Sequence, residues 1–524
     1  RYMQLSNLLC ILVIENNNNM KKLLLFGALG FTHLALATTI TVSNNNDSGV
    51  GSLRDAISNA VAGDTIVFDA NTDGVAITLT SGELLLNKDL DIIGNGMNTT
   101  IIDGSSTSRI FHVDNSGTNN DTINISSLTV QNGYHNSNGG GIGLGGAAHT
   151  SYILNLSIVE VKNCEAGNYG GGIHIGIGSI DNCYIHDNSA PNGSGGGVEA
   201  NWYPTNLTNT TISNNTARYV GGISFNGPSN MTNCTIYGNT GTDGSQGKGG
   251  CFVTGQITNC TISNNTGVQA GGLVHAGNSN VKMYNNIIYG NNGGDNVVIF
   301  IDSFEPPMGS GLDEATYGKN IVGSCSVLGS GTVNCPAWFS TDNPQFDPAG
   351  MQPNSIGIPS IAVICGSVAI DAANENFAPA TDQNGTSRYS LPDIGAVESG
   401  DIAPNNGVID LTDQLVSAAN GASYQWLDCN NNYSAIPGEN SQSFSPSSNG
   451  SYAVQIYEVG GICVDTSACY TISVVGISEY DLNEKKELII ILDFMGRETN
   501  FKPNTPLIFI YSDGTRERVM KIEE

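Results

Sequence analysis

Short apolar stretches alternate with polar ones along the middle of the chain, and between positions 160 and 295 the pattern recurs roughly every 25 residues, a solenoid-like period. Within each repeat a Gly-Gly pair is followed by an apolar residue, and usually by another two positions later. Side chains two positions apart on a strand point to the same face, so this alternation predicts strands that bury these residues. The predicted inward positions are Ile173, Val198, Ile223, Cys251 and Leu273.

Each repeat holds two or three such stretches, separated by Gly, Asn and Ser. Three short strands joined by turns make one coil of a solenoid. The Leu-x-x-Leu-x-Leu frame of a leucine-rich repeat is absent, and a propeller blade would need a longer period. We therefore predict an all-β chain whose main body is a right-handed parallel β-helix.

Identical residues recur in register from repeat to repeat. Cys183, Cys234 and Cys260 share one position, and a second position holds asparagine in five repeats, at Asn188, Asn215, Asn239, Asn265 and Asn291. Asparagine tolerates a left-handed backbone at a turn, and its amide can donate a hydrogen bond to the next coil. We interpret both rows as structural, because a residue repeated on every coil does not define one site.

Composition narrows the classes of function. The chain has a formal net charge of −28 and contains only 19 Lys plus Arg. Such a surface repels phosphate backbones, so we expect no nucleic-acid partner. No segment after the N-terminal region is long and apolar enough to span a membrane, so we expect no membrane-spanning segment.

The N-terminal region has the features of an export signal. Residues 20–37 combine a basic start, an apolar core and a small-x-small ending, which predicts a signal peptide and a mature chain that begins at Thr38. Residues 1–19 lie upstream of a plausible start and are interpreted as a mis-assigned translation start.

Export permits disulfides among the 12 cysteines. Cys325 and Cys335 bracket a short loop, as do Cys463 and Cys469. Cys429 has two candidate partners, Cys463 and Cys469. The sequence lacks a CxxC pair, a zinc-type Cys/His cluster and an EF-hand loop, so we expect no metal and no cofactor.

Both ends of the predicted solenoid carry motifs of a known group. Residues 52–57 read SLRDAI and residues 63–68 read GDTIVF. Residues 343–347 read NPQFD, residues 366–372 read GSVAIDA, and DQNG at 382–385 is followed by Arg388 and by DIGAVE at 393–398. These motifs resemble those of bacterial parallel β-helix surface proteins of the choice-of-anchor type. The resemblance implies a β-helix over residues 38–400 and a location at the cell surface, but no reaction. Residues 53–59 are expected to form a helix that caps the first coil.

Two further segments follow. Residues 401–475 resemble a small immunoglobulin-like β-sandwich. In this segment Trp426 is expected to be a core residue, and Tyr452 is placed as in a tyrosine corner. Residues 476–524, including LIIILDFMGRE at 488–498, form an expected small β-domain that resembles the sorting tails of type IX secretion cargo. This implies the secretion machinery as a partner, and secretion to the surface of a Gram-negative bacterium.

Three outward rows carry the candidate binding residues. One row aligns His174, Glu199 and Ser224, where the central Glu separates the Ser from the His and argues against a catalytic triad. The other two rows are Tyr184, Thr211, Thr235 and Thr261, and His186, Ser213, Tyr237, Ser263 and Tyr289. Rings and hydroxyls of this kind suit contact with neutral sugars, and they equally suit an ordinary sheet surface. The candidate binding residues are therefore Tyr184, His186, Tyr237, Tyr289, His174 and Glu199, and no residue is assigned as catalytic.

Three functions remain open at this point. The sequence favours a non-catalytic adhesin or glycan-binding surface protein. A carbohydrate-active enzyme on a β-helix is the first alternative, although only Arg109 and Arg218 supply arginine between residues 60 and 387 to hold an acidic sugar. A passive structural surface protein is the second alternative.

Overall fold

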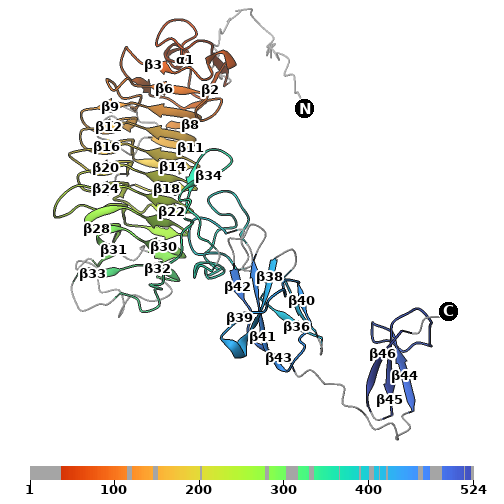
Figure 1. Ribbon diagram of the computed structural model, residues 1–524. Helices are drawn as coiled ribbons and strands as arrows, with labels where there is room; N and C mark the ends of the chain where they lie inside the picture. The colour runs from red at the N-terminus through yellow and green to blue at the C-terminus, as the bar shows by residue number, and fades with distance from the viewer. Residues whose placement is uncertain are drawn as a thin grey trace, which may run out of the picture. The chain divides into compact units, whose positions relative to one another are not determined.

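The repeats fold into stacked coils in the computed structural model (Figure 1), and every strand pairing between coils is parallel among the residues described. The structure describes residues 37–114, 121–144, 152–200, 203–277, 282–301, 317–329, 335–364, 366–388, 391–399, 406–411, 414–419, 423–457, 464–472, 487–512 and 514–520. The predicted signal peptide and the residues before it lie outside these ranges. The all-β class and the parallel β-helix are confirmed.

Each regular coil contributes one strand to each of three ladders. The first ladder contains β1 (Thr39–Val42), β2 (Asp64–Phe68), β5 (Leu90–Ile93), the first halves of β8 (Asp121–Gln131) and β11 (Tyr152–Lys162), β14 (Ile177–Asp181), β18 (Thr205–Thr208), β22 (Asn230–Thr232), β26 (Gln256–Thr258) and β29 (Lys282–Tyr284). The second contains β3 (Ile77–Thr78), β6 (Ile101–Asp103), the second halves of β8 and β11, β15 (Tyr184–His186), β19 (Thr211–Ser213), β23 (Thr235–Tyr237), β27 (Thr261–Ser263), β30 (Asn286–Tyr289) and β32 (Asn320–Val322).

The third ladder contains β4 (Leu84–Leu86), β7 (Phe111–Val113), β10 (Ile142–Leu144), β13 (Ile173–Ile175), β17 (Val198–Ala200), β21 (Ile223–Phe225), β25 (Cys251–Val253), β28 (Thr266–Gly277), β31 (Asn292–Ile301) and β33 (Cys325–Gly329). Short strands precede it at one corner: β9 (Tyr134–His135), β12 (Glu165–Ala166), β16 (Ser189–Ala190), β20 (Thr216–Ala217) and β24 (Thr240–Gly241).

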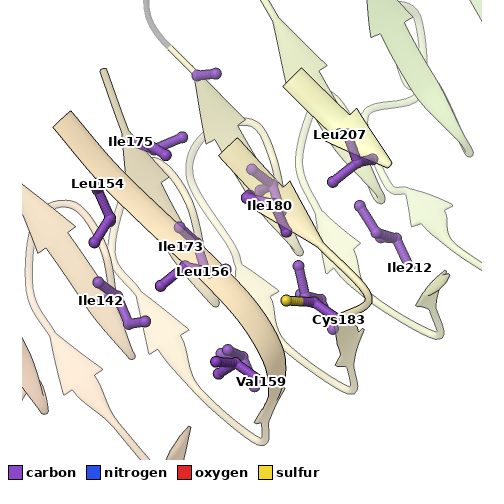
Figure 2. Packing of buried hydrophobic residues seen from close by; sticks show 14 of the residues in the cluster. Ile142, Leu154, Leu156, Val159, Ile173, Ile175, Ile180, Cys183, Leu207 and Ile212 are labelled. Atoms are coloured by element: carbon purple, nitrogen blue, oxygen red, sulfur yellow. The ribbon is translucent and has the colours of Figure 1, made fainter. Parts of the chain in front are cut away.

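The core lies inside the coils. Inward residues of successive coils stack on one another, and Figure 2 shows Ile142, Ile173 and Leu154 among those that fill the interior. The predicted inward residues after the Gly-Gly pairs are all fully buried, as are the cysteines of the shared row. This confirms the register that the alternation predicted.

The asparagine row forms a continuous hydrogen-bonded ladder at one corner. Asn215 Nδ2 donates to Asn239 Oδ1 at 3.0 Å, and Asn239 Nδ2 donates to Asn265 Oδ1 at 2.9 Å. The predicted amide bond to the next coil is therefore confirmed. Other asparagines adopt a left-handed backbone. Each of them stands one residue before the position that holds cysteine in three of the repeats: Asn182, Asn209, Asn233, Asn259 and Asn285.

A short helix covers the start of the solenoid, as predicted. Helix α1 (Leu53–Asn59) begins after Ser52, whose hydroxyl accepts a hydrogen bond from the Asp55 backbone N–H. Leu53 and Ile57 join the solenoid core. Lys88 Nζ donates to Ile57 O and Ala60 O at 3.1 and 2.9 Å, which satisfies carbonyls at the helix C-terminus. A 3₁₀ turn, η1 (Ala70–Thr72), lies after β2.

The coils end well before residue 400. The last described coil contact is the parallel bridge between Ile321 and Ser340. The chain then turns back along the coils in the segment that contains β34 (Gln352–Pro353) and β35 (Pro359–Ser360), and Figure 1 shows β34 beside them. Hydrogen bonds from Thr211 and Thr235 place this part of the chain over the second ladder. We call residues 352–362 and 371–398 the return segment.

The chain divides into two compact units, and the return segment belongs to the first, with the coils. The second unit contains small antiparallel sheets: β36 (Val408–Asp410), β37 (Leu415–Ser417) and β40 (Ser443–Phe444) in one; β38 (Ser423–Asp428), β39 (Ser434–Ala435), β41 (Gly450–Tyr457), β42 (Val464–Thr466) and β43 (Tyr470–Ile472) in another; and β44 (Leu488–Leu492), β45 (Leu507–Tyr511) and β46 (Arg516–Val519) in a third. The turn η2 (Cys429–Asn431) follows β38.

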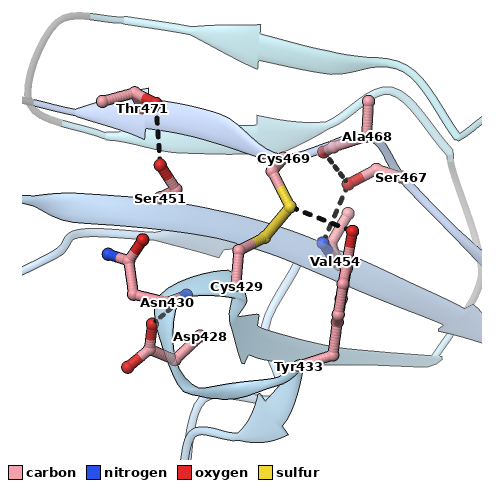
Figure 3. Close-up of a disulfide and its surroundings, with 10 residues drawn as sticks. All are labelled: Asp428, Cys429, Asn430, Tyr433, Ser451, Val454, Ser467, Ala468, Cys469 and Thr471. Atoms are coloured by element: carbon pink, nitrogen blue, oxygen red, sulfur yellow. Dashed lines mark hydrogen bonds between the residues drawn. A yellow bond between two sulfur atoms is a disulfide. The ribbon is translucent and has the colours of Figure 1, made fainter.

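Two disulfides are formed by the described cysteines. Cys325 is bonded to Cys335, and Cys429 to Cys469 (Figure 3), so the two alternatives for Cys429 resolve in favour of Cys469. Cys463 lies outside the described residues. Trp426 is fully buried, and the Tyr452 hydroxyl donates to Ser448 O at 2.9 Å. Among the described residues no helix has the length and apolarity needed to cross a membrane.

Candidate functional site

An aromatic row runs along the outer face of the second ladder. The strand registers align His186 with Ser213, Ser213 with Tyr237, Tyr237 with Ser263 and Ser263 with Tyr289. Rings therefore recur on every second coil, about 9.6 Å apart for a coil spacing of about 4.8 Å. Tyr237 and Tyr289 are half-buried, so each presents part of its ring to solvent. We call His186, Tyr237 and Tyr289, with the two serines between them, the aromatic row.

A charged cluster lies at the N-terminal end of this row. The rings of Tyr184 and His186 stack with their centroids 3.9 Å apart. His186 Nε2 lies 3.2 Å from Glu160 Oε1, and Lys162 Nζ donates to Glu160 Oε2 at 2.8 Å. Burial raises the pKa of Glu160, but hydrogen bonds from His186, Lys162 and Thr129 outweigh it and lower the pKa to about 2. Glu160 is therefore a fixed anion that orients the Lys162 ammonium and the His186 ring.

The threonine row next to the aromatic row is covered, which corrects its interpretation as a sugar-contacting surface. Thr211 and Thr235 are fully buried beneath the return segment. Gln383 accepts from the Thr235 hydroxyl at 2.6 Å and donates to Thr211 Oγ1 at 2.6 Å, and Thr211 donates to Pro359 O. On this row only Tyr184 remains partly exposed among the four aligned residues. The Thr211 and Thr235 hydroxyls therefore attach the return segment to the coils.

Corner asparagines extend this attachment over several coils. Asn233 Nδ2 donates to Thr381 O at 2.7 Å, and Asn259 Nδ2 donates to Asp393 O at 3.0 Å. Asn285 both donates to Asn374 O and accepts from the Asn374 backbone N–H. The side chains that extend from the left-handed corners thus bind the main chain of the return segment.

A buried ion pair organises the return segment itself. Arg388 Nη1 donates to Glu398 Oε2 at 2.8 Å, and these side chains are only 2% and 1% exposed. Asp393 N also donates to Glu398 Oε2 at 3.0 Å, and Asp382 accepts from the backbone of Asn384 and Glu398. The DQNG motif, Arg388 and the DIGAVE motif are therefore joined by one set of buried hydrogen bonds and an ion pair.

The row of His174, Glu199 and Ser224 lies on the third ladder, away from the aromatic row. Its register is as predicted, but the expectation of an outward row open to a ligand is wrong, because these residues are only 0%, 2% and 3% exposed. Glu199 Oε1 accepts from Asn226 Nδ2 at 2.7 Å, and Asn226 also lies 3.3 Å from Ser224 Oγ. Burial raises the pKa of Glu199 to about 8. The row is a buried polar cluster with a protonated carboxyl at neutral pH.

This raised pKa predicts a pH-dependent stability. The unfolded chain releases the Glu199 proton at the ordinary pKa, whereas the folded chain retains it until about pH 8. The folded state then binds more protons in this interval, so the free energy of unfolding should fall as the pH rises from 5 to 8. We expect a fall of at least about 1 kcal/mol, since one pKa unit corresponds to about 1.4 kcal/mol. Urea unfolding of the wild type and of Glu199→Gln across this range measures it. The Gln variant, which resembles the neutral acid, should lose this part of the slope; parallel curves would refute the assignment.

Sequence reasoning missed Glu160 and Lys162. They occupy the outward positions of β11 that correspond to Tyr184 and His186 on β15. Their coil lacks the Asn-Cys motif of the later repeats, since Ile158 and Val159 stand at those positions. Alignment by apolar alternation instead of by the motif would have placed both residues beside His186.

No protein-family model matches the chain, and no curated protein matches it. Among solved structures, the chain is similar to that titled "Crystal structure of pectate lyase Pel9A", with a TM-score of 0.38 and 14% sequence identity. The match covers 70% of this chain and 98% of the other.

Proposed function

We propose that this chain is an exported surface protein whose β-helix binds a linear, neutral polysaccharide along the aromatic row. The observation that carries the proposal is the recurrence of half-buried rings on every second coil. The serines between them, Ser213 and Ser263, are small and buried, so the rings are the exposed part of the row. Tyrosine rings offer an apolar face to a sugar ring and a hydroxyl to its polar edge. A repeating surface suits a repeating ligand, because sugar units that recur at the spacing of the rings meet the same kind of side chain.

The charges favour a neutral ligand over an acidic one. Arg109 is 4% exposed and lies beside Glu83, and Arg218 pairs with Asp243 at 3.2 Å while its guanidinium lies over the Tyr219 ring. Lys162 is paired with Glu160. The described arginines of the coils are thus engaged within the protein, and the net charge of −28 opposes an anionic polymer.

Substitution of Tyr237 by alanine tests the proposal. The row would lose its central ring, and the affinity of the full chain for the neutral polysaccharide it binds on a glycan array should fall about tenfold, as expected for truncation of an interface aromatic. Tyr184→Ala, which also removes the ring stacked on His186, should have a similar effect. Tyr169→Ala is the matched control, because Tyr169 is 44% exposed at a different corner.

The outcomes separate the alternatives. Unchanged binding in Tyr237→Ala and Tyr184→Ala would exclude the aromatic row as the site. Release of shortened sugars from a bound polymer would favour a carbohydrate-active enzyme, and no binding to any glycan would favour a passive structural protein.

Export and surface attachment belong to the same proposal. The β44–β46 sheet exposes apolar side chains, with Ile489 and Phe494 60% exposed and Met495 77% exposed. Exposed apolar groups of this kind suit capture by a partner protein, and we propose the type IX secretion machinery of a Gram-negative bacterium. Fusion of residues 476–524 to a periplasmic reporter should carry it to the cell surface, and a reporter that stays in the periplasm would refute this.

A further inference from the structure

An open hollow of about 680 Å³ lies on the second unit, a volume within the range of small-molecule sites. It is lined by the start of β38, the end of β41 and residues 440–442. The two strands are antiparallel neighbours, and Ser423 is paired with Tyr457 across them. The two paired strands thus form one side of the hollow, and residues 440–442 line the rest of it.

Hydrogen bonds hold the lining side chains in place. Gln425 Nε2 donates to Trp426 O and to Ile436 O, both at 2.9 Å, so both amide hydrogens are used and the oxygen Oε1 is left to accept from a ligand. Gln442 Nε2 donates to Ser417 O and Ala419 O at 2.9 and 2.8 Å. Side chains that are fixed before binding lose little conformational entropy when a ligand arrives.

The two tyrosines of the hollow are also fixed. The Tyr457 hydroxyl donates to Gln455 Oε1 at 2.6 Å, and the Tyr424 hydroxyl donates to Ala419 O at 2.7 Å. Each phenolic oxygen therefore presents its lone pairs to an incoming donor. Both rings are half-buried. Strand alternation puts Tyr457 on the face of Ser423 and Gln425, whereas the Tyr424 ring packs against the core around Trp426. Tyr457 therefore supplies the apolar surface of the hollow, and its hydroxyl supplies a polar edge.

The described lining contains serine, glutamine, asparagine and tyrosine, and none of its members is charged. Its oriented oxygens accept hydrogen bonds from hydroxyl groups, and the Tyr457 ring suits the flat face of a sugar ring. We propose that this hollow binds a neutral saccharide, as a second site on a different unit from the aromatic row. The inference goes beyond the proposed function and does not require it.

The test uses the full chain and a panel of neutral gluco-, manno-, xylo- and galacto-oligosaccharides, with binding measured by calorimetry. Tyr457→Ala should weaken binding of the recognised saccharide about tenfold. Asn440→Ala should weaken it about threefold; Asn440 is exposed, so this variant keeps the test valid if Tyr457→Ala disturbs the module. Near-ultraviolet circular dichroism of buried Trp426 reports on folding. Tyr433→Ala, which removes an exposed tyrosine outside the hollow, is the control.

Loss of binding in Tyr457→Ala and Asn440→Ala, but not in Tyr433→Ala, supports the proposal. Unchanged affinity in both variants overturns it, as does the absence of binding to every member of the panel. If Tyr237→Ala abolishes binding and Tyr457→Ala does not, the hollow is excluded while the aromatic row stands. The opposite pattern supports the hollow and excludes the row.

Discussion

Substitution of Asn239 by leucine should lower the free energy of unfolding of the solenoid by about 4 kcal/mol, because buried donors and acceptors lose their partners. Asn239 Oδ1 accepts from both the backbone N–H and the Nδ2 of Asn215, and Asn239 Nδ2 donates to Ile212 O at 3.0 Å. Asn215 and Asn239 are fully buried, so water cannot replace these bonds. Leucine is close in size but offers no polar atom.

The effect can be measured globally and locally. Urea unfolding gives the change in stability, and hydrogen exchange of the Asn215 backbone amide reports on the broken bond itself. Asn206→Leu is the matched control, since Asn206 is an exposed asparagine on the first ladder, and it should change stability by less than about 0.5 kcal/mol. Equal effects of the two substitutions would show that the asparagine ladder does not carry the stability of this corner.

Substitution of Arg388 by methionine should destabilise the return segment by about 3 to 5 kcal/mol, the usual consequence of removing one partner of a buried ion pair. The Glu398 carboxylate would stay buried without its guanidinium, and Arg388 Nη2 would no longer donate to Gly395 O at 2.9 Å. Gly395 is one of the points where the segment contacts the coils, since its N–H donates to Asn285 O at 2.8 Å. The segment should therefore detach while the coils persist.

Limited proteolysis measures this result, because a detached segment becomes accessible to cleavage. The double variant Arg388→Met and Glu398→Met should recover much of the loss, since a buried ion pair can be replaced by apolar residues at little net cost. A double variant as unstable as the sum of the single changes would argue that the ion pair does more than neutralise two buried charges.

The sequence predicted well those features that repeat from one coil to the next. The inward residues Ile173, Val198 and Ile223 could be placed because alternation and a repeated Gly-Gly pair are local signals. Helix α1 was expected at residues 53–59, which begin within the SLRDAI motif, and it lies there. The asparagine ladder followed from register alone, since stacking brings identical residues together.

The return segment could not be predicted in this way. Thr235 and Gln383 are 148 residues apart in sequence, and no periodic signal links them. The threonines therefore looked like an open surface until the structure placed the segment over them. The burial of Glu199 was missed for a related reason: alternation shows which side chains point outward, but not what covers them. Glu160 and Lys162, which lie beside the aromatic row, were missed because their coil lacks the repeat motif.

The return segment also sets the length of the solenoid. It is attached at Thr211, Asn233, Asn259 and Asn285, which belong to successive coils. Insertion of one extra coil between them would displace the later attachment points by about 4.8 Å along the axis and misalign the segment with them. Coils before Thr211 carry no such constraint from these four contacts. A lengthened version of this protein should therefore tolerate a duplicated coil in its N-terminal half and reject one between Thr211 and Asn285.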